Sequence, residues 1–310
     1  LDIEFRRAGW LWGATCAGQV GRWRGVMTAL AALGREPFRE LDRQGVEELL
    51  HAPGLLAAAY DPVPATLHPG KLARGLRAAA LAAGVAIYER SPMVRLERGR
   101  APAVVTAGGR IDAGRVILCM NAWSLALPEL RPGILVITSD DVVTPPVPAF
   151  LERHRWRQGP LVTDSGVFVA GWRTTADGRV VAGVTGGKIG FGSLDGQRFE
   201  GRTPREGDIL EALRQGFGEV GELSVAASWR GPIDRTRSGL PIFGPLPGEE
   251  RILFGYGFSG NGIVGCNLGA KILASLALER RDEWAACSLV GRPERWMPPE
   301  PIRYVGAHMV

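Results

Sequence analysis

The spacing of apolar and polar residues along the chain predicts an alternation of helices and short strands. Apolar residues recur at helical spacing in four stretches, at residues 22–33, 46–50, 68–84 and 203–217. Apolar runs and alternating patterns bounded by Gly, Pro or Asp predict strands, at residues 4–15, 85–90, 93–99, 101–109, 110–123, 135–143, 161–164, 167–170, 179–184, 223–229 and 251–254. Helices joined to buried apolar strands are typical of α/β proteins, and the meanders add an antiparallel α+β part.

Two of the expected helices carry signals at their ends. Pro69 fits the first helical position of one, and Gly84 fits its C-terminal stop. In the other, Thr203 is the expected N-cap and Pro204 the first helical residue, with Glu206 completing a capping box.

The order of the elements predicts two interleaved domains. The α/β pattern occupies residues 66–125 and 225–292, and a strand-rich pattern occupies residues 1–65 and 126–224. Residues 293–310 follow as a C-terminal segment.

Composition narrows the classes of protein to consider. The chain has 310 residues, 45% of them hydrophobic and 22% charged, which is ordinary for a globular protein. It has no apolar run of membrane-spanning length, and its first residues lack the apolar core of a signal peptide. The net charge is +5, but the arginines are scattered and form no basic stripe for nucleic acid.

Cysteines and histidines give no sign of a metal site. The 4 cysteines form no C-x-x-C pair, and the 4 histidines have no ligand spacing to one another. A metal-dependent or Ser-His-Asp hydrolase is therefore the weaker class. Without signalled disulfides, a reducing, cytoplasmic compartment is the expectation.

The stretch "GYGFSGNGIVGCNLGAKIL" at residues 255–273 is the strongest candidate for a binding site. It follows the apolar strand "RILF" and reads as a glycine-rich turn that opens a helix. A helix N-terminus gathers unpaired N–H groups and the positive end of the helix dipole. Such a turn suits an anion or an electron-rich ring edge.

"GFSGNG" before an apolar helix resembles the C-terminal flavin-binding segment of the D-amino-acid-oxidase-like FAD-dependent oxidoreductases, which include glycine, sarcosine and γ-glutamylputrescine oxidases. Four further segments are similar to that family in type and order, namely "HPGKLARGLRAAALAAGVAIYERSPM", "RVILCMNAW", "SWRGPIDRTRSGLPIFGPLP" and "PPEPIRYVGA". The resemblance implies a doubly wound FAD-binding sheet, with its N-terminal βαβ unit missing, interleaved with a substrate domain on a mostly antiparallel sheet. Residues 66–125 and 225–292 would be the FAD-binding part.

The resemblance also implies contacts with FAD. The pyrimidine end of the flavin would lie at Gly257, Phe258, Ser259, Gly260, Asn261, Gly262 and Ile263, where the helix N-terminus stabilises the charge of the reduced ring. The Met93 backbone would meet the adenine, although ordinary strand packing also explains that residue. Cys119, Asn121 and Trp123 would line the dinucleotide, at a turn where the family commonly has Gly in place of Asn121; Trp123 fits a core position equally well.

Lys188 is the candidate catalytic residue. "GGKIGFG" resembles the lysine segment of sarcosine oxidases, where a lysine near the flavin assists the reaction with oxygen. A solvated lysine in a glycine turn is the alternative. The histidine that follows four residues later in those enzymes is Gly192 here.

Departures from the family bear on the substrate. Glycine oxidase places a carboxylate-binding arginine where Gly260 stands, and sarcosine oxidase places a lysine where Val264 stands. We therefore expect a larger primary or secondary amine as substrate, oxidised by hydride transfer to flavin N5. Arg173 or Arg230 are further candidates for a carboxylate clamp.

The family opens with a G-x-G-x-x-G unit that holds the FAD pyrophosphate, and no such motif precedes residue 120. Weak or no FAD binding by these residues alone is the expectation. Three interpretations stay open: a flavin amine oxidase or dehydrogenase, a flavin-free and catalytically silent member of the fold, or a subunit whose FAD site is completed by a missing N-terminal segment or a partner chain.

Overall fold

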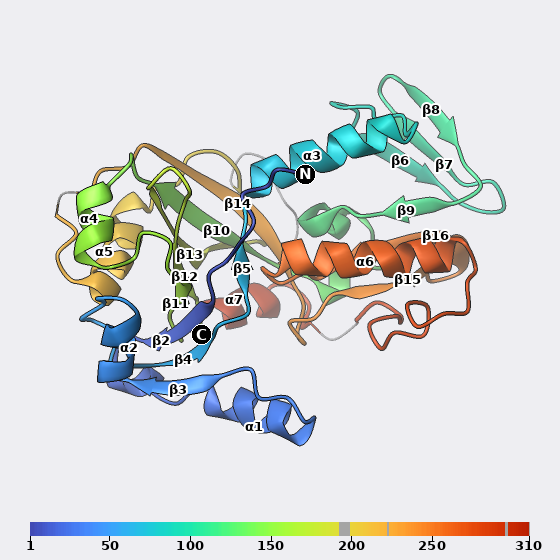
Figure 1. Ribbon diagram of the computed structural model, residues 1–310. Helices are drawn as coiled ribbons and strands as arrows, with labels where there is room; N and C mark the ends of the chain where they lie inside the picture. The colour runs from blue at the N-terminus through green and yellow to red at the C-terminus, as the bar shows by residue number, and fades with distance from the viewer. Residues whose placement is uncertain (192–198, 222, 295–296, 310) are drawn as a thin grey trace. The chain divides into compact units, whose positions relative to one another are not determined.

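The computed structural model describes residues 1–191, 199–221, 223–294 and 297–309, and the chain divides into two compact units (Figure 1). The first unit comprises Leu1–Ala83, Ser139–Gly187 and Glu200–Gly231. The second comprises Gly84–Thr138, Lys188–Phe199 and Pro232–Val310. The chain therefore passes between the units several times, and each unit is built from segments far apart in sequence.

An eight-stranded sheet, most of whose residues belong to the first unit, has the order β14-β10-β13-β12-β11-β2-β4-β3. Its strands are β2 (Trp10–Ala14), β3 (Arg39–Asp42), β4 (Ala57–Asp61), β10 (Leu135–Val143), β11 (Leu161–Thr163), β12 (Ala170–Thr174), β13 (Val180–Ile189) and β14 (Ala227–Arg235). The β11–β2 pair is parallel, whereas β2–β4, β3–β4, β11–β12 and β12–β13 are antiparallel.

One face of this sheet packs against helices. Alternate strand residues such as Leu11, Val162 and Trp172 are buried there together with Leu213 and Phe217. The helices of this unit are α1 (Arg24–Ala32), α2 (Arg43–Leu49), α3 (Pro69–Ala82), α4 (Pro148–Arg153) and α5 (Glu206–Phe217), with the 3-10 turn η1 (Ala17–Gln19). A separate two-stranded ladder pairs β1 (Arg6–Arg7) with β5 (Ala65–Thr66).

The second unit is built on a mixed three-stranded sheet in the order β15-β16-β9. Strand β16 (Glu249–Tyr256) is antiparallel to β15 (Ile242–Leu246) and parallel to β9 (Val116–Leu118). Helix α6 (Gly262–Ala277) runs beside β15 and β16 (Figure 1) and packs Ile272 and Leu273 against Phe243 and Leu253. The remaining elements are the antiparallel meander β6 (Met93–Glu97), β7 (Ala103–Thr106) and β8 (Gly109–Asp112), the 3-10 turns η2 (Asn121–Ala126) and η3 (Arg131–Gly133), and α7 (Ile302–His308).

Most expected elements are confirmed within a few residues, and four expectations are wrong. Residues 85–90 form no strand: they pair with no other strand of the described chain, and Val85, Ile87 and Tyr88 are exposed. The strand expected at 4–15 is split into β1 and β2 by Gly9, whose φ is +78°. The strand expected at 167–170 begins only at Ala170.

The expected capping box of α5 is also wrong. The helix begins at Glu206 with Arg205 as N-cap, and no side chain caps it. Thr203 is buried instead and donates its hydroxyl to the carboxylate of Asp140, 2.6 Å away. The same hydroxyl accepts from the N–H of Arg205 at 3.0 Å, which lies before the helix, so Thr203 is anchored to Asp140 outside the first turn of α5.

No helix in the described part of the chain is long and apolar enough to cross a membrane. In the same part of the chain, no group of three or more His, Cys, Asp or Glu side chains is arranged to hold a metal ion.

Candidate functional site

The turn between β16 and α6 has a backbone that demands glycine at its first position. Gly257 is buried with a φ of +85°, and a side chain there would overlap the methyl group of Thr236. Ser259 and Gly260 also have positive φ values, +52° and +97°. The chain therefore reverses sharply within four residues before the helix begins at Gly262.

Asp234, at the end of β14, holds the first half of this turn. Its carboxylate is buried and accepts hydrogen bonds from the N–H groups of Gly257 at 2.6 Å and Phe258 at 3.1 Å, and its carbonyl accepts one from Ser259 at 3.3 Å. Burial raises the pKa of Asp234, and the two turn N–H groups act in the opposite direction. The sequence gives no signal for this bond, because Asp234 lies 23 residues before Gly257.

The second half of the turn is open. Asn261, the N-cap of α6, makes no side-chain capping bond, and a side chain added at Gly260 or Gly262 would meet nothing within 4 Å. Ile263 and Val264 are 44% and 75% exposed. Within the described residues, no protein group accepts a hydrogen bond from the N–H groups of Gly262, Ile263 or Val264. These N–H groups and the helix dipole are therefore free to bind negative charge.

The contact of Gly257 to Ile263 with a flavin stays a prediction, and the structure divides these residues into two groups by the partners of their N–H groups. The N–H groups of Gly257 and Phe258 are committed to Asp234, and the Phe258 ring packs edge-on to Phe243 with centroids 6.1 Å apart. The N–H group of Asn261 is also taken, by the carbonyl of Phe258 at 2.8 Å, so the donors available to a ligand are those of Gly262, Ile263 and Val264.

The end of β9 lies at the same edge of the sheet as this turn. Leu118 is opposite Phe254 in the parallel pair, so the residues after both strands leave at the carboxyl edge, where α/β folds bind ligands. Burial raises the pKa of the Cys119 thiol, and the neighbouring Cys266 thiol of α6 adds to the shift. Cys119 itself follows β9 directly and is exposed.

Asn121 occupies the left-handed region, with a φ of +48°. Asn tolerates this conformation far better than residues with branched side chains, so Asn121 fits a turn where the family resemblance predicts Gly. Its side-chain amide donates to the carbonyl of Pro232 at 3.3 Å, two residues before Asp234. Asn121 therefore joins the β9 turn to the strand that holds the glycine turn.

Trp123 and Met93 differ in exposure. Trp123 is 45% exposed and is not a core residue. Met93 is half-buried, opens β6 opposite Thr106 and packs against the core around β9 and β16. Strand packing therefore accounts for Met93 in the structure, and its contact with adenine stays a prediction.

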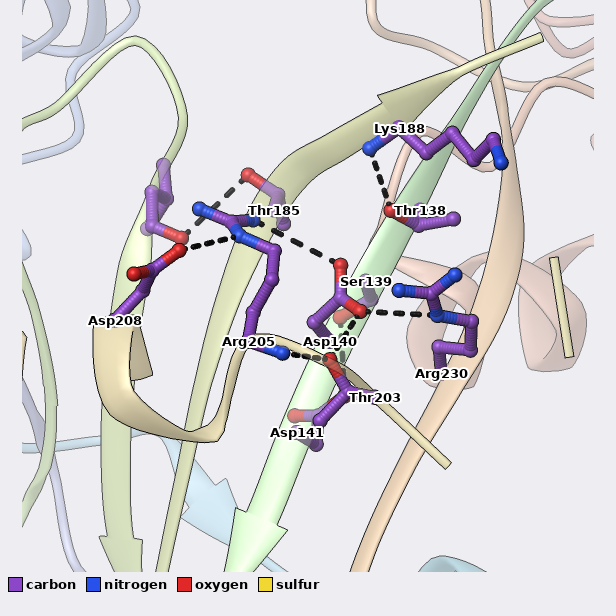
Figure 2. Close-up of polar contacts among 11 residues, drawn as sticks. Thr138, Ser139, Asp140, Asp141, Thr185, Lys188, Thr203, Arg205, Asp208 and Arg230 are labelled. Atoms are coloured by element: carbon purple, nitrogen blue, oxygen red, sulfur yellow. Dashed lines mark hydrogen bonds and ion pairs between the residues drawn. The ribbon is translucent and has the colours of Figure 1, made fainter. Parts of the chain in front are cut away.

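Lys188 lies near the end of β13, and its backbone N–H donates to the buried hydroxyl of Thr138 at 2.9 Å (Figure 2). Among the described residues, no hydrogen bond or ion pair engages its ammonium group. Gly192, the position of the expected histidine, lies outside the described residues. The catalytic role of Lys188 stays a prediction.

Of the two arginines considered as candidates for a carboxylate clamp, Arg230 already pairs with a carboxylate of the protein. Its Nε donates to the fully buried carboxylate of Asp140 at 3.2 Å, and Arg205 lies 3.7 Å from the other oxygen (Figure 2). Removing a partner from a buried carboxylate is strongly destabilising, so Arg230 is a structural residue. Arg173 makes no ion pair within 4.0 Å in the described part of the chain.

A protein-family model described as FAD dependent oxidoreductase (DAO) matches residues 1–276. The chain is 26% identical over 255 residues to the "Probable oxidoreductase OrdL" of Haemophilus influenzae, which covers 79% of this chain and 55% of that protein. It is 25% identical over 257 residues to γ-glutamylputrescine oxidoreductase of Escherichia coli K12, covering 81% of this chain and 58% of that protein. The chain thus spans little more than half the length of these relatives. Glycine oxidase from Geobacillus kaustophilus has a similar fold, with a TM-score of 0.76 at 21% identity over 91% of this chain and 74% of that one.

Proposed function

The chain belongs to the FAD-dependent oxidoreductase (DAO) family, and on this premise we propose that the open half of its glycine turn binds the flavin of FAD. The observation that supports this proposal is the uncapped N-terminus of α6, at the carboxyl edge of the parallel pair β9–β16. Gly260 and Gly262 leave its approach clear of side chains. Residues with these properties fit a flat ring that carries negative charge when reduced.

We propose that the reaction is oxidation of the C–N bond of an amine or amino-acid derivative. Bound FAD would supply the two-electron acceptor, with hydride passing from the carbon next to nitrogen to flavin N5. The chain's own contribution is positional. The first N–H groups of α6 would stabilise negative charge on the reduced flavin, and Asp234 holds the turn that precedes them. Cys119, Asn121 and Trp123 would line the dinucleotide from the β9 turn.

The substrate is proposed to be a primary or secondary amine larger than glycine or sarcosine. Gly260 and Val264 offer no charge for a carboxylate at the two places where the small-amino-acid oxidases of the family supply one. Steady-state kinetics on a panel of amines checks this. Turnover of glycine or sarcosine with ordinary affinity would contradict it.

We propose that tight binding of FAD needs a G-x-G-x-x-G unit that holds the pyrophosphate. A segment preceding residue 1 or a partner chain would supply this unit. Without it we expect saturable but weak binding, with little flavin retained through purification. A stoichiometric flavin absorbance spectrum from this chain alone would contradict the need for such a unit. Amine-dependent bleaching of the flavin in the completed protein would separate an enzyme from a silent member of the fold.

Titration of the purified chain with FAD, followed by quenching of flavin fluorescence, tests the turn itself. The Gly262→Val variant places a branched side chain over the open N–H groups, and we expect a loss of about tenfold in affinity, or ~1.4 kcal/mol. Gly207→Val is a matched control, because Gly207 also lies in the first turn of a helix, α5, with open space around it. It should leave FAD binding unchanged. Equal loss in both variants, or no quenching by the wild type, would refute the assignment.

A further inference from the structure

The first unit contains a cavity of about 820 Å³ whose walls include none of the residues assigned to the flavin. Its walls come from β1 and β5, the start of α3, the β12–β13 hairpin and β14. The volume is within the range of small-molecule sites. Three arginines line it: Arg6, Arg173 and Arg179.

Arg173 reaches this cavity from the face of the sheet opposite the helical core. Its strand neighbours Trp172 and Thr174 are buried on the core side, and Arg173 pairs with Val181 of β13. Within the described chain, the one hydrogen bond that its guanidinium donates is long, 3.4 Å, to the carbonyl of Leu67. Burial lowers the pKa of Arg173, and Asp141 partly offsets that shift.

Arg6 likewise has an N–H donor that no described residue accepts. One terminal nitrogen donates to the hydroxyl of Thr174 at 3.1 Å. Its Nε is buried and has no hydrogen-bond partner in the described protein. Burial lowers the pKa of Arg6 as well, because the charged form has lost water without gaining a carboxylate.

Arg179, which lines the same cavity, differs from these two arginines because its guanidinium forms an ion pair. Its Nε donates to the carboxylate of Asp177 at 2.6 Å. Within the described residues, Arg6 and Arg173 have no such ion pair. Buried N–H donors are paired in most proteins, so two under-used guanidiniums in one cavity indicate a place for a planar anion.

The apolar residues of the cavity indicate what kind of molecule would bear the negatively charged group. Phe5, Val143, Val181 and Trp229 give the cavity an apolar side. We propose that Arg6 and Arg173 bind the carboxylate of a small organic acid whose apolar body rests against these residues. Guanidinium groups match the two oxygens of a carboxylate with parallel hydrogen bonds. The inference does not depend on flavin binding and is measured without it.

Calorimetric titration of the full chain with hexanoate tests the proposal, with hexanamide as the uncharged analogue and inorganic phosphate as the plain anion. We expect saturable hexanoate binding and at least about tenfold weaker hexanamide binding, since hydrogen bonds to charged groups are the stronger ones. Phosphate should bind more weakly than hexanoate, because it cannot use the apolar walls. No saturable hexanoate binding, or equal affinity for hexanoate and hexanamide, would overturn the proposal. Phosphate competing with equal affinity would overturn the assignment to an organic acid.

Arginine variants locate the site. Arg173→Gln and Arg6→Gln should each weaken hexanoate binding by about tenfold or more. Arg7→Gln is the matched control, because Arg7 neighbours Arg6 in β1 but is exposed and does not line the cavity. It should change the affinity less than twofold. Thermal unfolding of each variant confirms its fold, and the hexanamide comparison in the wild type stands if a variant does not fold. Unchanged affinity in folded Arg173→Gln would refute the site.

Discussion

At the scale of single residues, the carboxylates on and beside the eight-stranded sheet differ in what surrounds them. Asp140 points into the helical core and is neutralised by Arg230 and Arg205. Asp141, the next residue, points to the opposite face and has no ion pair within 4.0 Å among the described residues. Asp234 is buried and bound by backbone N–H groups. These environments lead to two different predictions.

Asp234→Ala should destabilise the second unit. It leaves the buried N–H groups of Gly257 and Phe258 without an acceptor, and an unsatisfied buried donor costs about 1–3 kcal/mol. Urea unfolding measures the change in the free energy of unfolding. Asp112→Ala is the control, because Asp112 is exposed in the same unit and its ion pair with Arg110 is worth little. Equal stability of the Asp234 and Asp112 variants would contradict the role given to Asp234.

Asp141 should make stability depend on pH. Burial raises the pKa of Asp141 from its ordinary 3.8 to about 6, while Ser139 and Arg173 act in the opposite direction. The folded protein therefore holds this proton more tightly than the unfolded chain. The resulting stabilisation is full below about pH 4 and is lost as the pH rises through about 6, a change of ~3 kcal/mol.

Unfolding of the wild type and Asp141→Asn at several pH values checks this prediction. The variant should gain stability relative to the wild type between about pH 4 and pH 6, since an amide does not ionise. A constant difference between the two proteins across this range would show that Asp141 has an ordinary pKa in the fold.

At the scale of elements, the sequence predicted the helices, strands and turns whose position depends on residues close together in the chain. The helix from Pro69, the meander from Met93 to Asp112 and the strand–turn–helix around Gly257 lie where the sequence placed them. Where the structure differs from the sequence-based expectation, contacts between segments far apart in the chain determine the outcome. Thr203 binds Asp140 instead of capping α5, and Asp234 takes donors that the turn alone would leave free. Residues 85–90 have strand-like composition, but a strand also needs a neighbour to pair with.

The turn after β9 gives a prediction at this scale. Asn121 has a φ of +48°, where a β-branched residue is strained by roughly 1–2 kcal/mol. Asn121→Val should therefore lower the midpoint of urea unfolding, whereas Asn121→Gly should nearly keep it. Equal losses in the two variants would indicate that the amide bond to Pro232, and not the backbone conformation, is what the position requires.

At the scale of the whole molecule, the chain builds two compact units from alternating segments. Every residue predicted to contact FAD, and Lys188, belongs to the second unit, whereas the arginine-lined cavity belongs to the first. The sequence identified the glycine turn because its spacing is local and its family resemblance is specific. It did not identify the division between committed and open N–H groups, because that division depends on Asp234.

Hydrogen–deuterium exchange of the full chain with and without FAD tests the central claim most directly. With FAD at concentrations that quench its fluorescence, the amides of Gly262, Ile263 and Val264 should exchange more slowly, because they become donors to the flavin. The first amides of α5, from Glu206 to Asp208, should exchange at an unchanged rate. FAD binding that leaves the first turn of α6 unprotected while slowing exchange elsewhere would contradict the account.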